Sequence, residues 1–117
     1  MGDIFRDTFL GFVRAHLLYH ASKGRIFGVE MIDELREHGY DLSPGTLYPI
    51  LHAMESAGLL KSEREVVEGK TRKYYKATAE GRKVLGKLQG KIWELSRELL
   101  EHRPKPRGKP LKHRIRG

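Results

Sequence analysis

The sequence of 117 residues contains no cysteine, so disulfide bonds, thiolate metal sites and thiol catalysis are excluded. Only carboxylates and the six histidines remain as candidate metal ligands. No apolar run approaches the roughly 20 residues of a membrane-spanning helix, so we expect no membrane partner. The first residues, MGDIFRD, carry acids where a signal peptide carries basic residues. We therefore expect an intracellular, cytoplasmic protein.

Acidic residues are missing from the last fifteen positions, RPKPRGKPLKHRIRG, which hold seven basic residues and three prolines. The whole chain has 23 Lys and Arg against 15 Asp and Glu, so this segment supplies most of the net charge of +8. Such a segment cannot bury enough apolar surface to fold, and we predict a basic disordered tail at residues 103–117. It either follows nucleic-acid phosphates or only raises solubility, and the sequence leaves both open.

The strongest local signals lie between residues 42 and 77. Ser43 and Pro44 suit the N-cap and first position of a helix, and Gly58 suits a left-handed residue after its end. Apolar residues recur at helical spacing between them, at Leu47, Ile50, Leu51 and Met54. Two β-type segments follow, LLKSEREVV and RKYYKA, joined by EGKT. We predict a capped helix followed by a hairpin that turns at Gly69.

Two more helices are expected before this region. The first covers residues 3–22, with Asp3 as N-cap and Gly24 closing it, and the second covers residues 28–38, with Gly39 as its stop. The apolar stripe of the first holds Phe5, Phe9, Phe12, Val13, Leu17 and Leu18, and that of the second holds Val29, Ile32 and Leu35. The three phenylalanines predict deep burial. The second helix, a brief turn and the helix that starts at Ser43 have helix-turn-helix spacing.

A last helix is expected to begin after Thr78 and to run to about His102, before Pro104. Its apolar residues keep the heptad spacing of a coiled-coil seam, at Leu85, Leu88, Ile92, Leu95 and Leu99. An apolar stripe needs cover, and we predict that it meets the same helix of a second subunit, together with Phe5 and Phe9. Alternatively, the stripe packs on the first helix of its own chain, and both arrangements can hold in part.

The segments LSPGTLYPILHAMESAGLLKSE and GKTRKYYKATAEGRKVL resemble the PadR family of bacterial and archaeal transcriptional regulators. The resemblance spans residues 8–102, and its most specific parts are the block SPGTLYP and the block RKYY that precedes TAEG. It implies a homodimeric winged-helix repressor whose C-terminal helix is exchanged across the two-fold axis. The basic tail has no counterpart in the family pattern.

Together these elements predict a mainly α fold with a small β-hairpin wing, in which a winged helix-turn-helix is followed by a long dimerisation helix. We divide the chain into a DNA-binding domain at residues 1–77, a dimerisation helix at residues 78–102 and the basic tail at residues 103–117.

DNA contacts are expected at the start of the central helix and in the wing, because helix N-termini and hydroxyl groups bind phosphates. The predicted contacts are Ser43, Pro44, Gly45, Thr46, Tyr48, Pro49 and His52 on the helix, with Lys70, Arg72 and Lys73 at the wing. Tyr48 is the leading candidate, and the alternative is that it is a half-buried core residue. Since strand side chains alternate, we expect one of Tyr74 and Tyr75 to enter the core and the other to face outward.

Other ligands have weaker support in the sequence. We find no catalytic motif, so we expect neither enzyme activity nor a cofactor. His16 and His20 stand four apart on the first helix, a spacing that can bind zinc, but no third ligand is evident and we expect no metal site. Trp93 lies beside the heptad seam, where it either contacts a small aromatic effector or only packs in the interface. Some regulators that this chain resembles bind flat aromatic compounds or phenolic acids at the dimer interface.

We therefore expect a sequence-specific regulator, a repressor, that binds double-stranded DNA as a homodimer on a palindromic operator. Release by a small-molecule effector is a further hypothesis. Two alternatives remain: a winged-helix module that binds RNA or protein, and an architectural protein that binds nucleic acid nonspecifically.

Overall fold

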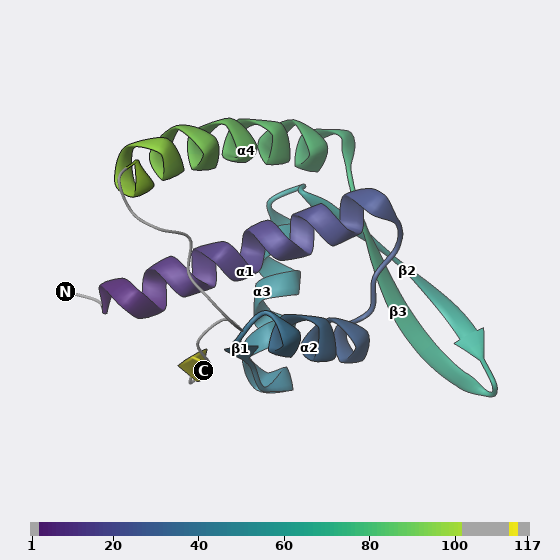
Figure 1. The fold of residues 1–117 in the computed structure, drawn as a ribbon. Coiled ribbons are helices and arrows are strands. Elements are labelled where there is room, and N and C mark those ends of the chain that lie inside the picture. Colours follow the sequence, from purple (N-terminus) through teal and green to yellow (C-terminus); the bar gives the residue numbers. More distant parts are fainter. Residues whose placement is uncertain (1–2, 102–112, 115–117) are drawn as a thin grey trace.

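The computed structural model describes residues 3–101 and 113–114. In chain order its elements are α1 (Ile4–Lys23), α2 (Gly28–Glu37), β1 (Tyr40–Asp41), α3 (Pro44–Ser56), β2 (Leu60–Val67), β3 (Lys70–Ala77), α4 (Ala79–Leu100) and β4 (His113–Arg114). α4 runs along one side of α1, α2 lies on the other side, and the β2–β3 hairpin projects from the helices (Figure 1). The predicted fold class is confirmed. Within the described residues, none of the helices has the length and hydropathy needed to cross a bilayer.

The helix starts follow the capping signals of the sequence. Asp3 Oδ1 accepts a hydrogen bond of 2.9 Å from the amide two residues on, and Thr78 Oγ1 accepts one of 3.0 Å from the amide of Gly81. Ser43 has the extended backbone of an N-cap, but no backbone amide of the described chain is capped by its hydroxyl. Instead, Ser43 Oγ lies 3.3 Å from Thr46 Oγ1. The starts of α1, α3 and α4 are therefore predicted correctly, although the cap of α3 differs in detail.

The hairpin closes through a turn of two residues. β2 and β3 are antiparallel and Val67 pairs with Lys70, which leaves Glu68 and Gly69 as the turn. Their φ angles are 51° and 76°. The tight turns that match the twist of a hairpin need positive φ at both central residues, and glycine adopts that conformation without a Cβ clash. The predicted turn at Gly69 is confirmed.

The core lies where α1, α2, α3 and the base of the hairpin meet. It contains all four apolar residues predicted on α3, namely Leu47, Ile50, Leu51 and Met54. The prediction for α2 is partly wrong: Val29 is exposed and Ile32 is only partly buried, whereas Met31 and Leu35 are in the core. A spacing of three residues drifts away from one face of a helix that has 3.6 residues per turn.

Tyr74 and Tyr75 are both buried, so the prediction that one faces outward is wrong. Tyr75 belongs to the core, and its backbone exchanges two hydrogen bonds of 2.8 Å with Ile26. Tyr74 is covered by Phe27, at 5.5 Å between ring centroids, and by the guanidinium of Arg25, 3.9 Å from its ring centroid. The loop between α1 and α2 thus covers this tyrosine, and no property of the strand itself predicted that cover.

The prediction that the three phenylalanines of α1 are deeply buried is also wrong. Phe5 is 67% exposed and Phe12 is 41% exposed, whereas Phe9 is partly buried against the core. Phe12 lines an open hollow together with Ile92 of α4. Helical periodicity placed the three rings on one stripe, but it does not show whether another element reaches that stripe.

Most of the predicted basic tail, residues 103–117, lies outside the described residues. The exception is β4, which pairs in parallel with β1, so that Tyr40 lies opposite His113 and Asp41 opposite Arg114. For the rest of the tail, disorder stays a prediction.

Candidate nucleic-acid interface

The residues predicted for DNA contact on α3 lie at the surface, with one exception. The exposed ones are Ser43, Pro44, Gly45, Tyr48, Pro49 and His52. Gly45, Tyr48 and His52 are spaced by three and four residues and share one helix face. Thr46 is the exception: it is only 6% exposed, and it turns its hydroxyl toward Ser43. Thr46 therefore supports the helix start from within, while the other residues form an exposed face.

Tyr48 is held in place by Gly28 in the first turn of α2. A Cβ on Gly28 would lie 2.6 Å from the ring and hydroxyl oxygen of Tyr48, so the ring rests directly on bare backbone. Tyr48 nevertheless keeps 38% of its surface exposed. One side of the side chain is thus fixed by α2, and the other side is open to solvent. Tyr48 is therefore partly a packed residue and partly a surface residue, so each of the two sequence predictions describes one side of it.

The three basic wing residues differ in their surroundings. Lys73 Nζ lies 3.6 Å from Glu55 Oε1 on α3, and the guanidinium of Arg72 lies 5.1 Å from the ring centroid of Phe27. Lys70, beside the turn, is exposed. Partly exposed ion pairs of this kind contribute at most about 1 kcal/mol, so a phosphate can compete for Lys73. Lys70 is thus exposed to solvent, whereas Arg72 and Lys73 contact groups of their own chain.

Sequence reasoning missed the polar contacts that fix the hairpin. Arg25 forms ion pairs with Glu63, at 3.3 Å, and with Glu65. The hydrogen bond from Arg25 lowers the pKa of Glu65, and the hydrogen bond from Ser62 is the main cause of a lowered pKa of Glu55. Two acidic groups of the wing, Glu63 and Glu65, and Glu55 of α3 are thus matched by partners within the chain, which weakens their repulsion of a polyanion. Charge patterning along β2 hinted at such pairing, but not at the partner in the loop after α1.

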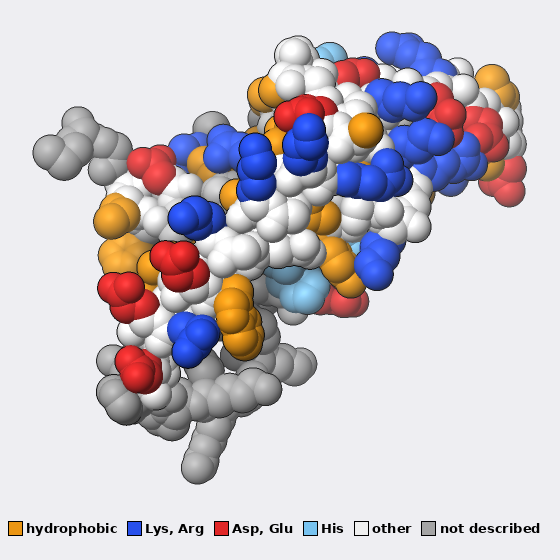
Figure 2. Space-filling view, turned by 90° about the horizontal axis from the view of Figure 1, so that it is seen from above, with side chains coloured by type: hydrophobic (Ala, Val, Ile, Leu, Met, Phe, Trp, Pro, Cys, Tyr) orange, Lys and Arg blue, Asp and Glu red, His pale blue; other side chains and the backbone are white. Residues whose placement is uncertain are grey.

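Seen from the side of α4, Lys and Arg side chains alternate with acidic ones, and several gather toward the end where the hairpin lies (Figure 2). This mixture agrees with the composition of residues 1–102, which hold 16 basic and 15 acidic side chains. The folded part therefore offers local basic positions rather than a uniformly positive surface.

A second surface, the α1/α4 apolar face, consists of the large apolar side chains that these two helices leave exposed. They are Ile4, Phe5, Phe12 and Tyr19 on α1, and Ile92, Trp93, Leu95, Leu99 and Leu100 on α4. Of the predicted interface residues, Leu85 is buried in its own chain, and Leu88 and Phe9 pack partly against the core. The stripe on α4 thus packs within the chain at its start, as one alternative held, and is exposed over its last turns. Patches of this kind mark interaction surfaces.

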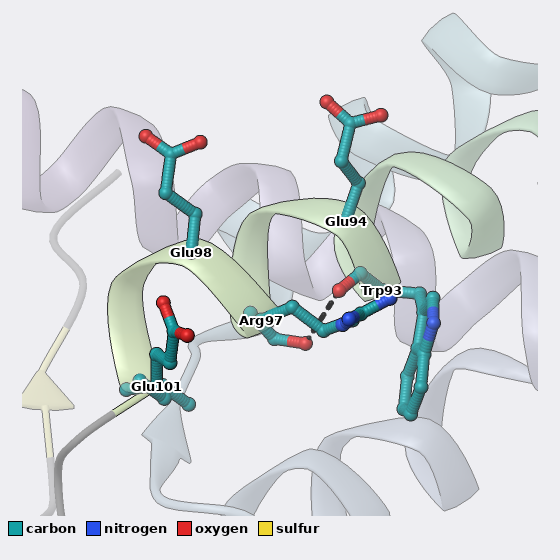
Figure 3. A pocket seen from close by; sticks show the side chains of 7 residues that line it. Trp93, Glu94, Arg97, Glu98 and Glu101 are labelled. Atoms are coloured by element: carbon teal, nitrogen blue, oxygen red, sulfur yellow. Dashed lines mark hydrogen bonds between the residues drawn. The ribbon is translucent and has the colours of Figure 1, made fainter.

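Trp93 is 67% exposed and lines an open hollow of about 660 Å³. Figure 3 shows that its ring points away from the helix, on the side opposite Glu94 and Glu98. All the residues that line this hollow belong to the end of α4 or follow it directly. A single chain therefore gives the hollow one wall, and a ligand there would need a second wall from another molecule.

Sequence reasoning also missed a cluster of imidazoles between α1 and α2. His16 and His20 of α1 are joined by His38, which directly follows α2, and by Glu34. The sequence alone did not reveal this third imidazole beside His16 and His20. Glu34 and His38 stand four apart, as His16 and His20 do, and this spacing could have marked them. That the two pairs face each other depends on helix packing.

The helix pair α2 and α3, with a hairpin after it, defines a winged helix-turn-helix protein. Residues 17–87 match the model of the transcriptional regulator PadR-like family. The chain is also 48% identical over 88 residues to transcriptional regulator Rv3488 from Mycobacterium tuberculosis, a match that covers 75% of this chain and 82% of that relative. The chain belongs to the PadR-like family of transcriptional regulators.

Solved structures agree with this assignment. A PadR family transcriptional regulator from Eggerthella lenta is similar with a TM-score of 0.64 and 30% identity, over 87% of this chain and 96% of that one. A PadR-like transcriptional regulator from Bacillus cereus has a TM-score of 0.75 over 86% and 99% of the two chains, and its 24% identity supports the fold alone. The family resemblance is confirmed, and the chain is a DNA-binding transcriptional regulator rather than an enzyme.

Proposed function

We propose that this regulator is a repressor that binds a palindromic operator as a homodimer. The observation that carries the proposal is the presence of two exposed surfaces of unlike chemistry on one small chain: the start of α3 beside the hairpin, and the α1/α4 apolar face. The first suits a DNA groove, and the second suits another copy of the chain. Such a regulator works at the chromosome, and we therefore place it in the cytoplasm.

In this proposal the exposed face of α3 enters the major groove. Tyr48 is the leading candidate for DNA contact because its ring is fixed on Gly28. Little side-chain entropy is then lost when its hydroxyl donates a hydrogen bond to a phosphate or a base edge. His52 lies one helical turn further along and reaches base edges. Ser43 and the first-turn amides receive a phosphate at the helix N-terminus. We leave Thr46 out of the contact set because it is buried.

The wing supplies phosphate contacts beside the groove. Lys70 neutralises a phosphate directly, whereas Arg72 and Lys73 first leave the ring of Phe27 and the carboxylate of Glu55. Such contacts fix the position of the protein on DNA without reading sequence. Specificity therefore rests on α3 and on the shape of the DNA.

Dimerisation sets the spacing of the two reading helices. The α1/α4 apolar face is covered when the last turns of α4 meet those of a second copy, and two-fold symmetry then presents two α3 helices to one side of the DNA. Half-sites about 34 Å apart, one turn of the duplex, would accept them. The palindrome mirrors the symmetry of the protein.

A flat aromatic effector fits the same interface. In the dimer a second subunit supplies the missing wall of the hollow beside Trp93, and bound ligand favours one angle between subunits. Titration of the protein with planar aromatic acids, followed by tryptophan fluorescence, tests this point. No quenching by any of them would remove the effector site while leaving the operator model intact.

Binding to DNA from upstream of the gene, and to a shuffled copy, tests the main proposal. Both the full chain and a version that ends at His102 are titrated across a salt series. The proposal expects both versions to prefer the upstream DNA, with the tail adding only salt-sensitive affinity. Equal binding to shuffled DNA, with affinity that vanishes with the tail, would replace the repressor by an architectural nucleic-acid binder.

A further inference from the structure

The imidazole cluster between α1 and α2 brings together four side chains from two helices. One ring nitrogen from each of His16, His20 and His38 can be chosen so that the three atoms lie within 4.8 Å of one another. Glu34 Oε1 lies 3.4 Å from the Nε2 atoms of both His20 and His38. Three ring nitrogens thus lie close together, with a carboxylate oxygen beside two of the rings, although these residues come from positions up to 22 apart in the sequence.

The distances are close to those of a metal site. Three atoms that are at most 4.8 Å apart can share a point about 2.8 Å or less from each of them, and a zinc–imidazole bond is about 2.0–2.1 Å long. Each nitrogen therefore needs to move by only about 0.7 Å, which small rotations about side-chain bonds supply.

The surroundings of His16 favour the neutral imidazole, the form that binds metal. His16 is partly buried, and burial first, with the nearby His38 and His20 next, lowers the pKa of His16. The rings of His16 and His38 stack at 4.6 Å between centroids. Three protonated imidazoles in this arrangement would repel one another, and a single carboxylate offsets only part of that repulsion. A bound cation with a charge of two instead accepts all three lone pairs.

The cluster also lies in a hollow with room for more than the side chains. This hollow of about 570 Å³ is bounded by α1, α2 and α4, and Tyr40, Leu85 and Gln89 are among its other lining residues. The space lets water complete the coordination of an ion. Leu85 contributes apolar surface to another side of the same hollow.

We propose that His16, His20 and His38, with Glu34 as the fourth protein ligand, bind one divalent transition-metal ion per chain. Imidazole nitrogen with one carboxylate suits Zn²⁺, Co²⁺, Ni²⁺ and Cu²⁺, whereas Mg²⁺ and Ca²⁺ require oxygen ligands. Bound metal ties the first helix to the helix that precedes the reading helix. This site does not depend on the proposed operator or on the dimer.

Isothermal titration of the full, untagged chain with ZnCl₂, at pH 7.5, tests the site. We expect one Zn²⁺ per chain. His16→Gln and His38→Gln each lower the affinity at least about 100-fold, because loss even of a group that only orients a ligand costs 10- to 100-fold. His52→Gln is the matched control, since His52 is exposed on α3 and lies outside the cluster. The zinc affinity of this variant should equal that of the parent chain.

Cobalt supplies a second readout that does not depend on heat. Co²⁺ at the site gives visible absorption bands typical of nitrogen and oxygen ligation, and the bands disappear in His38→Gln, whose position after the end of α2 tolerates the change. Far-UV circular dichroism confirms that each variant is folded. MgCl₂ gives no heat. Zinc binding that is absent, or that His16→Gln and His38→Gln reduce no more than His52→Gln does, would overturn the proposal.

Discussion

The exposed face of α3 around Gly45, Tyr48 and His52, which we propose as the DNA-reading surface, and the α1/α4 apolar face are built in opposite ways. Around α3, the exposed side chains are small or polar, and the tyrosine at the centre rests on a neighbouring helix. Along the last turns of α4, the exposed side chains are large and apolar, among them Leu95 and Leu99. All residues of the first surface come from one chain. The apolar side chains of the second surface would lose their exposure to water if another molecule packed on them. The difference indicates that folding of the reading unit and assembly of the regulator can be altered separately.

The two surfaces are connected at the start of α4. Thr78 Oγ1 donates a hydrogen bond of 2.6 Å to the carbonyl of Gly58 and accepts one from the amide of Gly81, and the Thr78 amide donates to the carbonyl of Leu59 at 3.1 Å. One threonine thus fixes the direction in which α4 leaves the hairpin. We call this connection, formed by Thr78 with Gly58, Leu59 and Gly81, the joint. Substitutions on either side of the joint test the function of each surface separately.

The largest effect is expected from acids placed on the apolar face. In Leu95→Glu with Leu99→Glu, the dimer dissociation constant should rise at least about 1,000-fold, because burial of each leucine contributes about 1.5–3 kcal/mol and a dimer contains two copies of each. Sedimentation equilibrium measures the change. Lys83→Glu with Lys87→Glu, exposed on other faces of the same helix, is the control and should remain dimeric. A double leucine variant that stays dimeric would place the interface elsewhere.

The joint itself should respond to a single methyl group. A Cβ on Gly81 would lie 2.1 Å from the carbonyl oxygen of Leu59, so Gly81→Ala should lower the free energy of unfolding by about 2 kcal/mol. Urea denaturation gives the value. Gly86→Ala in the same helix is the matched control: it meets open space and should raise the free energy of unfolding, by up to about 1 kcal/mol, since alanine favours helix more than glycine. Equal effects at the two positions would contradict this account of the joint.

On the reading surface, a methyl group on Gly28 should displace the ring of Tyr48 with little cost in stability. We expect Gly28→Ala to weaken operator binding about tenfold, a change of about 1.4 kcal/mol, because the phenol then loses its fixed position. Fluorescence anisotropy with labelled DNA measures the affinity. Gly11→Ala, where a Cβ meets open space on α1, should bind DNA normally. If Tyr48→Ala and Gly28→Ala both bind as tightly as the parent chain, Tyr48 does not contact DNA.

The smallest change is expected at the wing. Lys70→Ala should reduce the slope of log affinity against log salt by about 0.9 for each phosphate that the wing no longer neutralises, while the preference for operator over shuffled DNA stays the same. Lys83→Ala on α4 removes the same charge away from the reading surface and should leave the slope unchanged. Identical slopes in the two variants would show that the wing lysine is not at the DNA.

Local signals in the sequence predicted the elements well. Asp3 and Thr78 cap helices as expected, and Gly58 ends the region of α3 with a φ of 81°, the left-handed conformation that its position after the helix requires. These features depend on residues within one or two turns of each other. Their physical causes are present in the sequence itself.

The sequence did not predict how elements that are distant along the chain pack against each other. The burial of Thr46 and Tyr74, the role of Arg25 and the approach of His38 to His16 all depend on how helices and hairpin pack. Periodicity assigns a side chain to a face, but the neighbour of that face is set by tertiary structure. For the same reason the heptad stripe left open whether Leu85 meets a second subunit or packs within its own chain, where the structure places it.

The proposal of a two-fold regulator is tested most directly by selecting binding sites for the full chain from random-sequence DNA. Hydroxyl-radical footprinting is then carried out on the most enriched sequence. A dimer that presents two α3 helices should enrich an inverted repeat and protect two patches on one face of the duplex, with centres about 10 base pairs apart. The Leu95→Glu, Leu99→Glu variant should lose both patches together. Enrichment of a single, unrepeated motif, or of none, would contradict the account of a two-fold regulator assembled through α4.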